Sequence, residues 1–402
     1  MNLRLLKKIR LLIITHVVHY QFGGEIYAYG AYAREIELWA DLFREVAIAA
    51  PCRAESPPGD CLAFQHANIS IIPQLETGGR TLGAKMKQVL LLPRMIINLL
   101  SAARKADAIH VRCPGNLGLL GVLIAPLCSR RLIAKYAGQW GGYPGEPSSV
   151  RLQRWLLRSS WWHGPVTVYG SWPDQPSHVV PFFTSMLTDA QVFRAMSVAF
   201  MRNGKPIDHL LYVGRLSNSK HVDTFLEAIA RMRDEGISFR CSVVGEGAAR
   251  AELETQAREL GIEQNVNFAG GVNFEQVQNF YAQSDVLVLV SETEGWPKAL
   301  AEGMAYGLIC IGSNRGLVPA MLSNGRGIVV EPGNAEQLAD ALREIVRSPQ
   351  DFQPMRLRAA AWASQHSTEG LREALGELLT DHWICRPTPQ DRPFKPARGA
   401  YT

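Results

Sequence analysis

The chain has 402 residues, of which 47% are hydrophobic and 20% charged, a composition typical of a soluble globular protein. Because this length exceeds what one hydrophobic core usually serves, we predict two domains, over residues 1–190 and 191–385, and a disordered Pro- and Arg-rich tail over 386–402. The net charge of +5 is mild and comes without a basic run. It fits an anionic ligand or a membrane surface and gives little support to nucleic-acid binding.

The seven cysteines are odd in number and include no Cys-x-x-Cys pair, which indicates reduced thiols in a cytoplasmic protein rather than disulfides or a zinc site. The first apolar stretch, 11–15, is short and runs into histidines instead of a cleavage site, so we predict a strand and not a signal peptide. The longest uncharged apolar stretch, 117–128, is shorter than the roughly 18 residues of a membrane-spanning helix.

A glycine pair, Gly23 and Gly24, follows the first predicted strand. We predict a helix over about 25–40 and a second strand over 46–49, which together make a β-loop-α-β unit. Glycines in such a loop let the backbone approach a ligand closely. A simple turn explains the pair equally well.

A strand is predicted over 106–112, and its alternation places His110 and Arg112 on one face. A lone histidine of this kind is more often structural than catalytic. The next predicted strand, 132–136, leads into a glycine-and-aromatic loop over 137–143. That loop could hold an acceptor sugar, although a plain loop is an equal alternative.

Two segments of the first half combine basic and apolar residues: 85–104, and 151–162 with Arg151, Arg154, Arg158, Trp155, Trp161 and Trp162. Arg and Trp at helical spacing suit a surface that meets anionic lipid. Ordinary helices that bury one face are the slightly favoured alternative.

The second half opens with a strand over 210–213, followed by Gly214, Arg215 and Lys220. Two cations at the tip of a strand would supply fixed positive charge to a diphosphate. The next strand, 242–244, ends in a turn.

That turn contains Gly245 and Gly247. Arg250 stands where a dinucleotide-binding fingerprint requires glycine or alanine, so an NAD site is disfavoured.

The continuous apolar run over 285–290 predicts a strand buried on both faces, as in a parallel sheet. It leads through Gly295 and Trp296 to Pro297, which we place at the first position of a helix that Gly307 ends. Such a loop directs backbone N–H groups and the positive end of the helix at one spot, where a diphosphate would bind.

Two carboxylates, Glu294 and Glu302, flank this spot. Carboxylates repel a phosphate but accept hydrogen bonds from sugar hydroxyls. The pair therefore indicates a sugar next to a diphosphate.

The segment Glu-Gly-Trp-Pro-Lys-Ala-Leu-Ala-Glu-Gly-Met-Ala-Tyr-Gly and the earlier Gly-Arg-Leu-x-x-x-Lys closely resemble the motifs of retaining nucleotide-sugar glycosyltransferases of family 4. The resemblance is strong over about 209–345 and weak before it. Three positions depart from the family pattern: His221 replaces the usual glycine, Ala320 the usual glutamate, and Arg112 the second histidine of His-x-His.

This resemblance implies an α/β protein of two facing Rossmann-like, doubly wound domains, the GT-B arrangement, with the active site in the interdomain cleft. The first domain would bind the acceptor and the second the nucleotide sugar. Arg215 and Lys220 would hold the diphosphate, Glu302 the ribose and Glu294 the donor sugar. The remaining implied donor-site residues are Gly23, Gly24, Gly214, Gly245, Gly247, Gly295, Trp296 and Pro297.

By the same resemblance, no metal or cofactor is required beyond the donor. The acceptor would be a glycan or a lipid-linked sugar, with peripheral contact at the inner face of the plasma membrane and a role in cell-surface polysaccharide biosynthesis. A sugar-nucleotide epimerase or a sugar phosphorylase could share the fold. A non-catalytic sugar-nucleotide-binding protein is a further alternative, but it would be expected to have lost Glu294.

Overall fold

A computed structural model describes residues 3–76, 82–143, 145–185, 187–202 and 205–383, so the predicted tail and Cys385 lie outside the described residues. The chain forms two compact units. The N-terminal unit comprises Met1–Phe183 and the segment from Gly370, and the C-terminal unit comprises Thr184–Glu369. The boundary follows Phe183, whereas the sequence analysis places it at 190.

The end of the chain also differs from the expected division, because helix α13 (Thr368–Trp383) enters the N-terminal unit. Trp383 anchors it there, donating a hydrogen bond from Nε1 to the carbonyl oxygen of Leu132 over 3.2 Å. Its ring also meets Phe43 edge-on. The C-terminal unit therefore ends near residue 369 and not at 385.

The described residues of the N-terminal unit contain a ten-stranded sheet in the order β10-β9-β8-β7-β1-β4-β2-β3-β5, with β6 also paired to β4. All its pairs are parallel except β2 with β3 and β3 with β5. The strands are β1 (Arg10–Ile14), β2 (His19–Phe22), β3 (Glu25–Tyr29), β4 (Glu45–Arg53), β5 (Cys61–Ala63), β6 (Ile69–Gln74), β7 (Ala108–Cys113), β8 (Leu132–Tyr136), β9 (Val166–Tyr169) and β10 (Val179–Phe182).

The glycine pair does not introduce a helix, so that part of the sequence prediction is wrong. Gly23 and Gly24 have φ values of 60° and 84° and connect β2 to β3 as a tight hairpin. Two successive residues with positive φ match the right-handed twist of paired strands, which explains why glycines stand here. The alternating segment 25–29 is strand, and helix α1 begins only at Gly30 (Gly30–Leu42).

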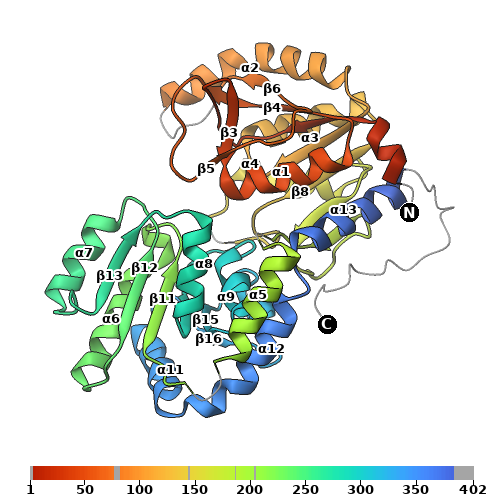
Figure 1. Ribbon diagram of the computed structural model, residues 1–402. Helices are drawn as coiled ribbons and strands as arrows, with labels where there is room; N and C mark the ends of the chain where they lie inside the picture. Colours follow the sequence, from red (N-terminus) through yellow and green to blue (C-terminus); the bar gives the residue numbers. More distant parts are fainter. Residues whose placement is uncertain (1–2, 77–81, 144, 186, 203–204, 384–402) are drawn as a thin grey trace. The chain divides into compact units, whose positions relative to one another are not determined.

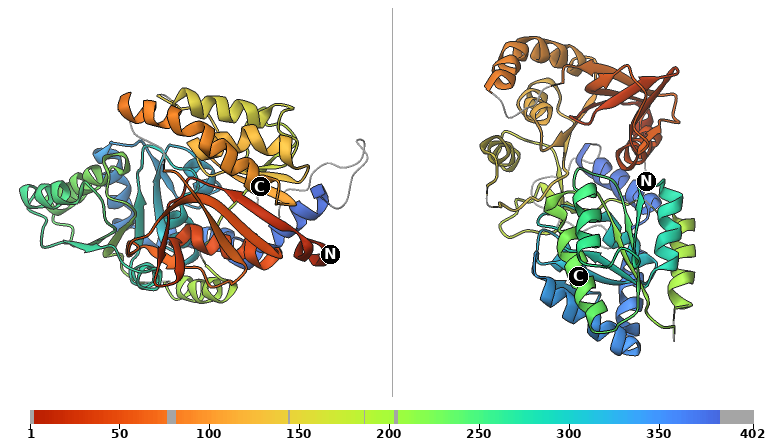
Figure 2. Two further views of the ribbon diagram at one scale, coloured as in Figure 1. Left: turned by 90° about the horizontal axis from the view of Figure 1, so that it is seen from above. Right: turned by 90° about the vertical axis from the view of Figure 1, so that its left-hand side faces the viewer.

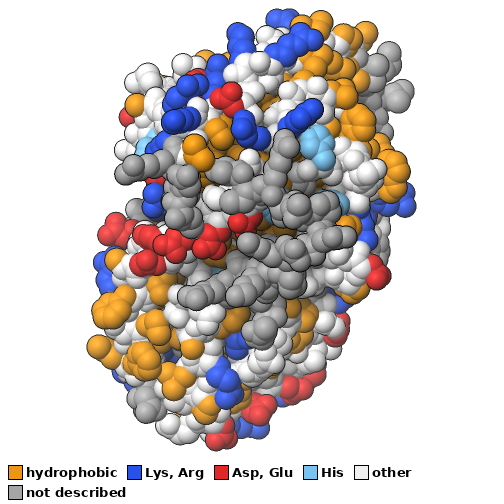
Figure 3. Space-filling view, turned by 90° about the vertical axis from the view of Figure 1, so that its right-hand side faces the viewer, with side chains coloured by type: hydrophobic (Ala, Val, Ile, Leu, Met, Phe, Trp, Pro, Cys, Tyr) orange, Lys and Arg blue, Asp and Glu red, His pale blue; other side chains and the backbone are white. Residues whose placement is uncertain are grey.

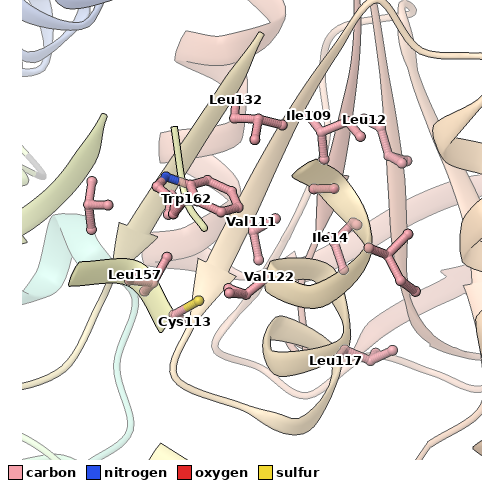
Figure 4. Close-up of a cluster of buried hydrophobic side chains, with 14 of the residues drawn as sticks. Leu12, Ile14, Ile109, Val111, Cys113, Leu117, Val122, Leu132, Leu157 and Trp162 are labelled. Atoms are coloured by element: carbon pink, nitrogen blue, oxygen red, sulfur yellow. The ribbon is translucent and has the colours of Figure 1, made fainter. Parts of the chain in front are cut away.

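Helices cover both faces of this sheet (Figures 1 and 2). Helices α1 and α13 lie on one face, while α2 (Leu82–Ala103), α3 (Asn116–Cys128) and α4 (Ser148–Arg158) lie side by side on the other. A short 3-10 helix, η1 (Leu3–Lys8), precedes β1. On this second face, side chains of β1, β7 and β8 pack against side chains of α3 and α4. Figure 4 shows this packing for Ile14, Val111, Val122 and Leu157.

The described residues of the C-terminal unit contain a six-stranded parallel sheet in the order β13-β12-β11-β14-β15-β16. The strands are β11 (His209–Val213), β12 (Arg240–Val244), β13 (Val266–Gly270), β14 (Val286–Leu289), β15 (Ile309–Ser313) and β16 (Ile328–Val330). The helices are α5 (Asp189–Phe200), η2 (Asn218–Lys220), α6 (Val222–Asp234), α7 (Arg250–Glu259), α8 (Phe274–Gln283), α9 (Lys298–Ala305), α10 (Val318–Leu322), α11 (Ala335–Arg347), η3 (Pro349–Phe352) and α12 (Gln353–Ala363). The predicted α/β class with parallel sheets is confirmed.

Each sheet contains a point where the chain reverses the direction in which it adds strands. In the N-terminal unit this switch lies between β1 and β7, and in the C-terminal unit it lies between β11 and β14. Ligands of doubly wound sheets bind in the crevice outside the carboxyl ends of the strands at such a point. In the described part of the chain, no helix has the length and apolarity needed to cross a membrane.

Acid is expected to destabilise the N-terminal unit through His110. The ring is buried and stacked on Trp39 at 4.5 Å, and neither ring nitrogen has a hydrogen-bond partner among the described residues. Burial lowers the pKa of His110 to about 3, so below its ordinary value of 6.5 the unfolded chain binds a proton that the folded chain does not.

Stability should therefore fall as the pH drops from 7 to 5, by about 2 kcal/mol from this group. Denaturant titrations at both pH values measure the effect. The change His110→Phe, which keeps an aromatic ring and removes the titrating group, should flatten the dependence. An equally steep dependence in that variant would assign the acid sensitivity to other groups.

Candidate functional site

The candidate site is formed by two loops at the carboxyl ends of β11 and β14, the neighbouring strands at the switch point of the C-terminal unit. The first loop spans 214–220 and the second 290–297. A backbone hydrogen bond joins them, donated by the amide of Glu292 to the carbonyl oxygen of Ser219 over 2.8 Å. The order of the strands thus brings together two motifs that are distant in the sequence.

Lys220 and Glu294 form an ion pair in which Nζ lies 2.5 Å from Oε1. They are 74 positions apart in the chain. Their side chains remain 23% and 12% exposed, so a ligand can reach both groups. The structure therefore places a predicted phosphate-binding cation next to a predicted sugar-binding carboxylate.

Arg215 is exposed, and its guanidinium has no partner among the described residues. Its backbone is fixed by Tyr212, whose hydroxyl donates to the carbonyl oxygen of Arg215 over 3.0 Å. The guanidinium of Arg215 at the carboxyl end of β11 is therefore available to bind an anion through two parallel hydrogen bonds.

The glycines around this loop are needed for packing of backbone against backbone. A Cβ on Gly245 would lie 1.8 Å from the carbonyl oxygen of Gly214, and a Cβ on Gly247 would lie 2.0 Å from that of Leu216. The amide of Leu216 donates to the carbonyl oxygen of Glu246 over 2.9 Å. The turn after β12 therefore supports the loop that carries Arg215.

Trp296 is packed into the C-terminal unit. It is buried, and its ring stacks on Trp362 at 6.1 Å and lies 5.5 Å from His366. Pro297 occupies the N-cap of α9, one position before the predicted one. Trp296 therefore anchors the loop 290–297, and Gly295 links Trp296 to Glu294.

Gly316 is a site residue that the motif analysis missed. Its φ is 57°, and a Cβ there would lie 2.0 Å from the carbonyl oxygen of Glu294. The backbone at Gly316 thus packs directly against the backbone of the loop that carries Glu294. The segment Arg-Gly-Leu-Val-Pro after β15 contains this glycine, but the spacing alone gives no sign of the contact.

His221 explains one departure from the family pattern. Its backbone is left-handed, with φ of 51°, which is the conformation that the usual glycine adopts without strain. The imidazole Nε2 lies 3.3 Å from Oε2 of Glu292. The other carboxylate oxygen of Glu292, Oε1, lies 3.5 Å from Nε of Arg315. His221, Glu292 and Arg315 therefore form a network of charges beside Lys220.

Glu302 is buried and accepts a hydrogen bond from the hydroxyl of Tyr281 over 2.9 Å. Burial and the adjacent carboxylate raise the pKa of Tyr281 well above its ordinary value, so Tyr281 remains a donor. On its other side Glu302 lines a small pocket with Thr184, Ser185, Lys298 and His366. No three His, Cys, Asp or Glu side chains of the described residues are arranged to hold a metal ion.

Three predicted features of the N-terminal unit have structural explanations. Gly23 and Gly24 are exposed at the tip of the hairpin, where the simple-turn alternative accounts for them. His110 is a buried structural residue, as its neighbourhood shows. In the loop 137–143 Trp140 is buried against Tyr136, so that indole is not available to stack on a sugar.

The Trp and Arg cluster divides into buried and exposed members. Arg154 pairs with Glu146, and Trp162 belongs to the core, so both are excluded from a lipid-facing surface. Trp155 is 63% exposed and Trp161 39%. Other exposed residues on this face are Leu90, Arg94 and Ile97 of α2, Leu123 and Leu127 of α3, and Arg151, Leu152 and Arg158 of α4.

We call these exposed residues of α2, α3 and α4, with Trp161, the helical surface. Figure 3 shows apolar side chains gathered along the right-hand edge of the N-terminal unit and basic side chains beside them. The side chains of Lys85 and Lys87, which the sequence analysis includes in the basic segment, lie outside the described side chains.

The sequence of the C-terminal unit matches the model of a known family. The family model described as Glycosyl transferases group 1 matches residues 202–363, a range that includes Arg215, Lys220, Glu294 and Glu302. Over these residues the chain is therefore similar to group 1 glycosyltransferases.

Curated relatives match over a similar range. The amylovoran biosynthesis glycosyltransferase AmsK of Erwinia amylovora is 29% identical over 38% of this chain and 39% of its own length. The lipopolysaccharide 1,6-galactosyltransferase of Salmonella typhimurium is 31% identical over 36% of this chain and 41% of its own. The GDP-mannose-dependent phosphatidylinositol dimannoside mannosyltransferase of Mycobacterium tuberculosis is 28% identical over 42% and 44%. The matches thus span about two fifths of these relatives.

Solved structures match over nearly the whole chain. The Anabaena protein Alr3699/HepE, crystallised with UDP and glucose, superposes with a TM-score of 0.68 over 92% of this chain and 99% of its own, at 16% identity. WaaG, a glycosyltransferase involved in lipopolysaccharide biosynthesis, gives 0.63 over 92% and 100%, at 17% identity. The predicted GT-B fold is confirmed by these likenesses.

Proposed function

We propose that this protein is a retaining glycosyltransferase that moves a sugar from a nucleotide diphosphate sugar to a glycan or lipid-linked acceptor in polysaccharide biosynthesis. The observation that carries the proposal is the Lys220–Glu294 pair beside the unpartnered Arg215 at the switch point of a unit similar to group 1 glycosyltransferases. The names of the relatives support it, since they include a GDP-mannose-dependent enzyme and an enzyme of lipopolysaccharide synthesis.

In this proposal the two cations bind the diphosphate of the donor. As the bond from the anomeric carbon to the diphosphate breaks, negative charge builds up on the leaving oxygen, and Arg215 and Lys220 stabilise it. The acceptor oxygen bonds to the same face of the sugar, and its proton passes to the leaving phosphate. Glu294 accepts hydrogen bonds from the donor sugar, and its contact with Lys220 orients it between sugar and phosphate.

The two glutamates should affect donor binding differently. Glu302, assigned to the ribose, is held by Tyr281, and Glu302→Gln retains an oxygen for that hydrogen bond while removing the charge. It should weaken binding of the free nucleoside diphosphate. Glu294→Gln should leave that binding nearly unchanged and impair binding of the intact nucleotide sugar. Calorimetry with both ligands decides the matter, and equal losses in the two variants would show that the roles are misassigned.

We also propose that the helical surface places the N-terminal unit on anionic lipid at the inner face of the plasma membrane, where a lipid-linked acceptor would be found. The surface combines exposed Trp155 and Trp161 with Arg151 and Arg158. Tryptophan partitions to the membrane interface, and each basic residue near anionic lipid adds about 1 kcal/mol.

Co-sedimentation with vesicles of phosphatidylglycerol and phosphatidylcholine tests this surface. Binding should fall with salt, and Arg151→Gln with Arg158→Gln should lower it by about tenfold or more. The matched control removes two exposed arginines of the C-terminal unit, Arg240→Gln with Arg347→Gln, and should leave binding unchanged. Binding that is absent, or equal in both double variants, would assign the helical surface another role.

Product analysis distinguishes the proposed reaction from others that this fold supports. Incubation with a panel of nucleotide sugars should release nucleoside diphosphate only when an acceptor glycan is present. Conversion of the donor without acceptor would indicate an epimerase. Formation of a sugar 1-phosphate from a glycan and inorganic phosphate would indicate a phosphorylase. Binding without any turnover would indicate a sugar-nucleotide-binding protein.

A further inference from the structure

A second charged cluster lies at the switch point of the N-terminal unit, outside the site described above. Glu35 of α1 contacts two cations there: Lys135 of β8, with Nζ 2.8 Å from Oε2, and Arg112 of β7, with Nη1 3.4 Å from Oε1. The side chains are nearly buried, with exposed fractions of 6% for Glu35, 7% for Lys135 and 14% for Arg112.

The cluster has an excess of positive charge. Among the described residues, Glu35 is the carboxylate that forms ion pairs with both Arg112 and Lys135. The neighbouring histidines add no positive charge at neutral pH, because burial lowers the pKa of His16 and of His110. Tyr32 stays protonated, since burial raises its pKa. Two cations therefore share one carboxylate in a nearly buried place, which is costly unless an anion joins them.

Arg112 has the geometry to receive that anion. Its guanidinium lies 5.3 Å from the ring centre of Tyr32, and of its donors only those on Nη1 reach an acceptor among the described residues. It stands near the carboxyl end of β7, beside β1, where His16 follows the strand. This is the position at which a doubly wound sheet binds its ligand.

We propose that Arg112, at the switch point of the N-terminal unit, binds an anionic group, a phosphate or a carboxylate, of the molecule that accepts the sugar. The identity of the bound molecule as the acceptor rests on the proposed function, whereas the anion site itself does not. Glu35 and Tyr32 hold the guanidinium in place, and Lys135 adds the second charge. A guanidinium keeps its charge and offers a planar fork of donors, which suits both phosphate and carboxylate and cannot serve as a base.

Anion binding can be followed locally through the imidazole of His16, which senses the charge of Arg112. In an NMR titration of the full chain with inorganic phosphate and, separately, with glucuronate, the His16 resonance should shift on saturation with at least one of them. Glucose is the neutral control. A response to phosphate alone indicates a phosphorylated acceptor, and a response to glucuronate a sugar acid.

Variants identify the residue responsible. Arg112→Gln should weaken binding of the anion by about ten- to a hundredfold, while the fold is retained because Lys135 still pairs with Glu35. Arg112→Lys should restore part of the binding. The matched control Arg131→Gln removes an exposed arginine just before the amino end of β8, whereas Lys135 lies near the carboxyl end of this strand. This variant should bind the anion as the wild type does.

The inference would be overturned if neither anion shifted the His16 resonance, or if the shift persisted in Arg112→Gln. So would equal losses in the Gln and Lys variants when both remain folded. Titration of the same samples with UDP and GDP separates this outcome from failure of the proposed function, because donor binding depends on the C-terminal unit and should be unchanged in Arg112→Gln.

Discussion

Replacement of Lys220 by alanine is expected to lower kcat/KM for sugar transfer by about a hundredfold or more, and Arg215→Ala by about ten- to a hundredfold. Each change removes a charge-assisted hydrogen bond to the diphosphate, worth about 1.5 to 3 kcal/mol. Lys220→Ala has the larger effect because it also leaves the carboxylate of Glu294, only 12% exposed, without its partner.

Initial rates with saturating acceptor and varied donor measure this effect. Arg240→Ala is the matched control, since Arg240 lies at the amino end of β12 in the same sheet and is exposed. It should transfer at the wild-type rate. Near-normal transfer by both Lys220→Ala and Arg215→Ala would refute the diphosphate assignment.

Gly245→Ala is expected to destabilise the C-terminal unit by about 3 kcal/mol or more and to abolish donor binding in what remains folded. The new Cβ would lie 1.8 Å from the carbonyl oxygen of Gly214, and φ of 143° is unfavourable for alanine. Because the obstacle is backbone, only displacement of the loop that carries Arg215 relieves it.

Gly236→Ala provides the comparison. Gly236 has φ of 76°, and nothing lies within 4 Å of its added Cβ, so only the conformational cost of about 1 kcal/mol should appear. Denaturant unfolding and nucleotide affinity are measured for both variants. Equal, mild effects would show that the two loops do not depend on their close approach.

The elements around the candidate site could be predicted from sequence because their signals are local. The run 285–290 has no charged residue after Asp285, and the proline and glycine that bound α9 mark its ends. The parallel sheet follows from such runs, whose strands are buried on both faces.

Other features depend on tertiary contacts and could not be predicted in this way. The pairing of Lys220 with Glu294 joins loops 74 positions apart, and the support of Glu294 by Gly316 is a contact between backbones. Trp296 is part of the predicted motif, but its burial against Trp362 follows from the packing of α12.

A helix is predicted where strand β3 lies, because the residues of this strand, Glu-Ile-Tyr-Ala-Tyr, do not exclude one. The decisive signal was the glycine pair, whose positive φ values suit a hairpin turn. Likewise, nothing in the sequence of α13 indicates that Trp383 returns to the N-terminal unit.

The most direct test of the account is calorimetric titration of UDP and of GDP into the wild type, Arg215→Ala, Lys220→Ala and the control Arg240→Ala. One nucleotide is expected to bind the wild type and the control equally and to bind each of the other variants about ten- to a hundredfold more weakly. Affinity that is the same in all four proteins, or no binding of either nucleotide to the wild type, would contradict a diphosphate site at the carboxyl ends of β11 and β14.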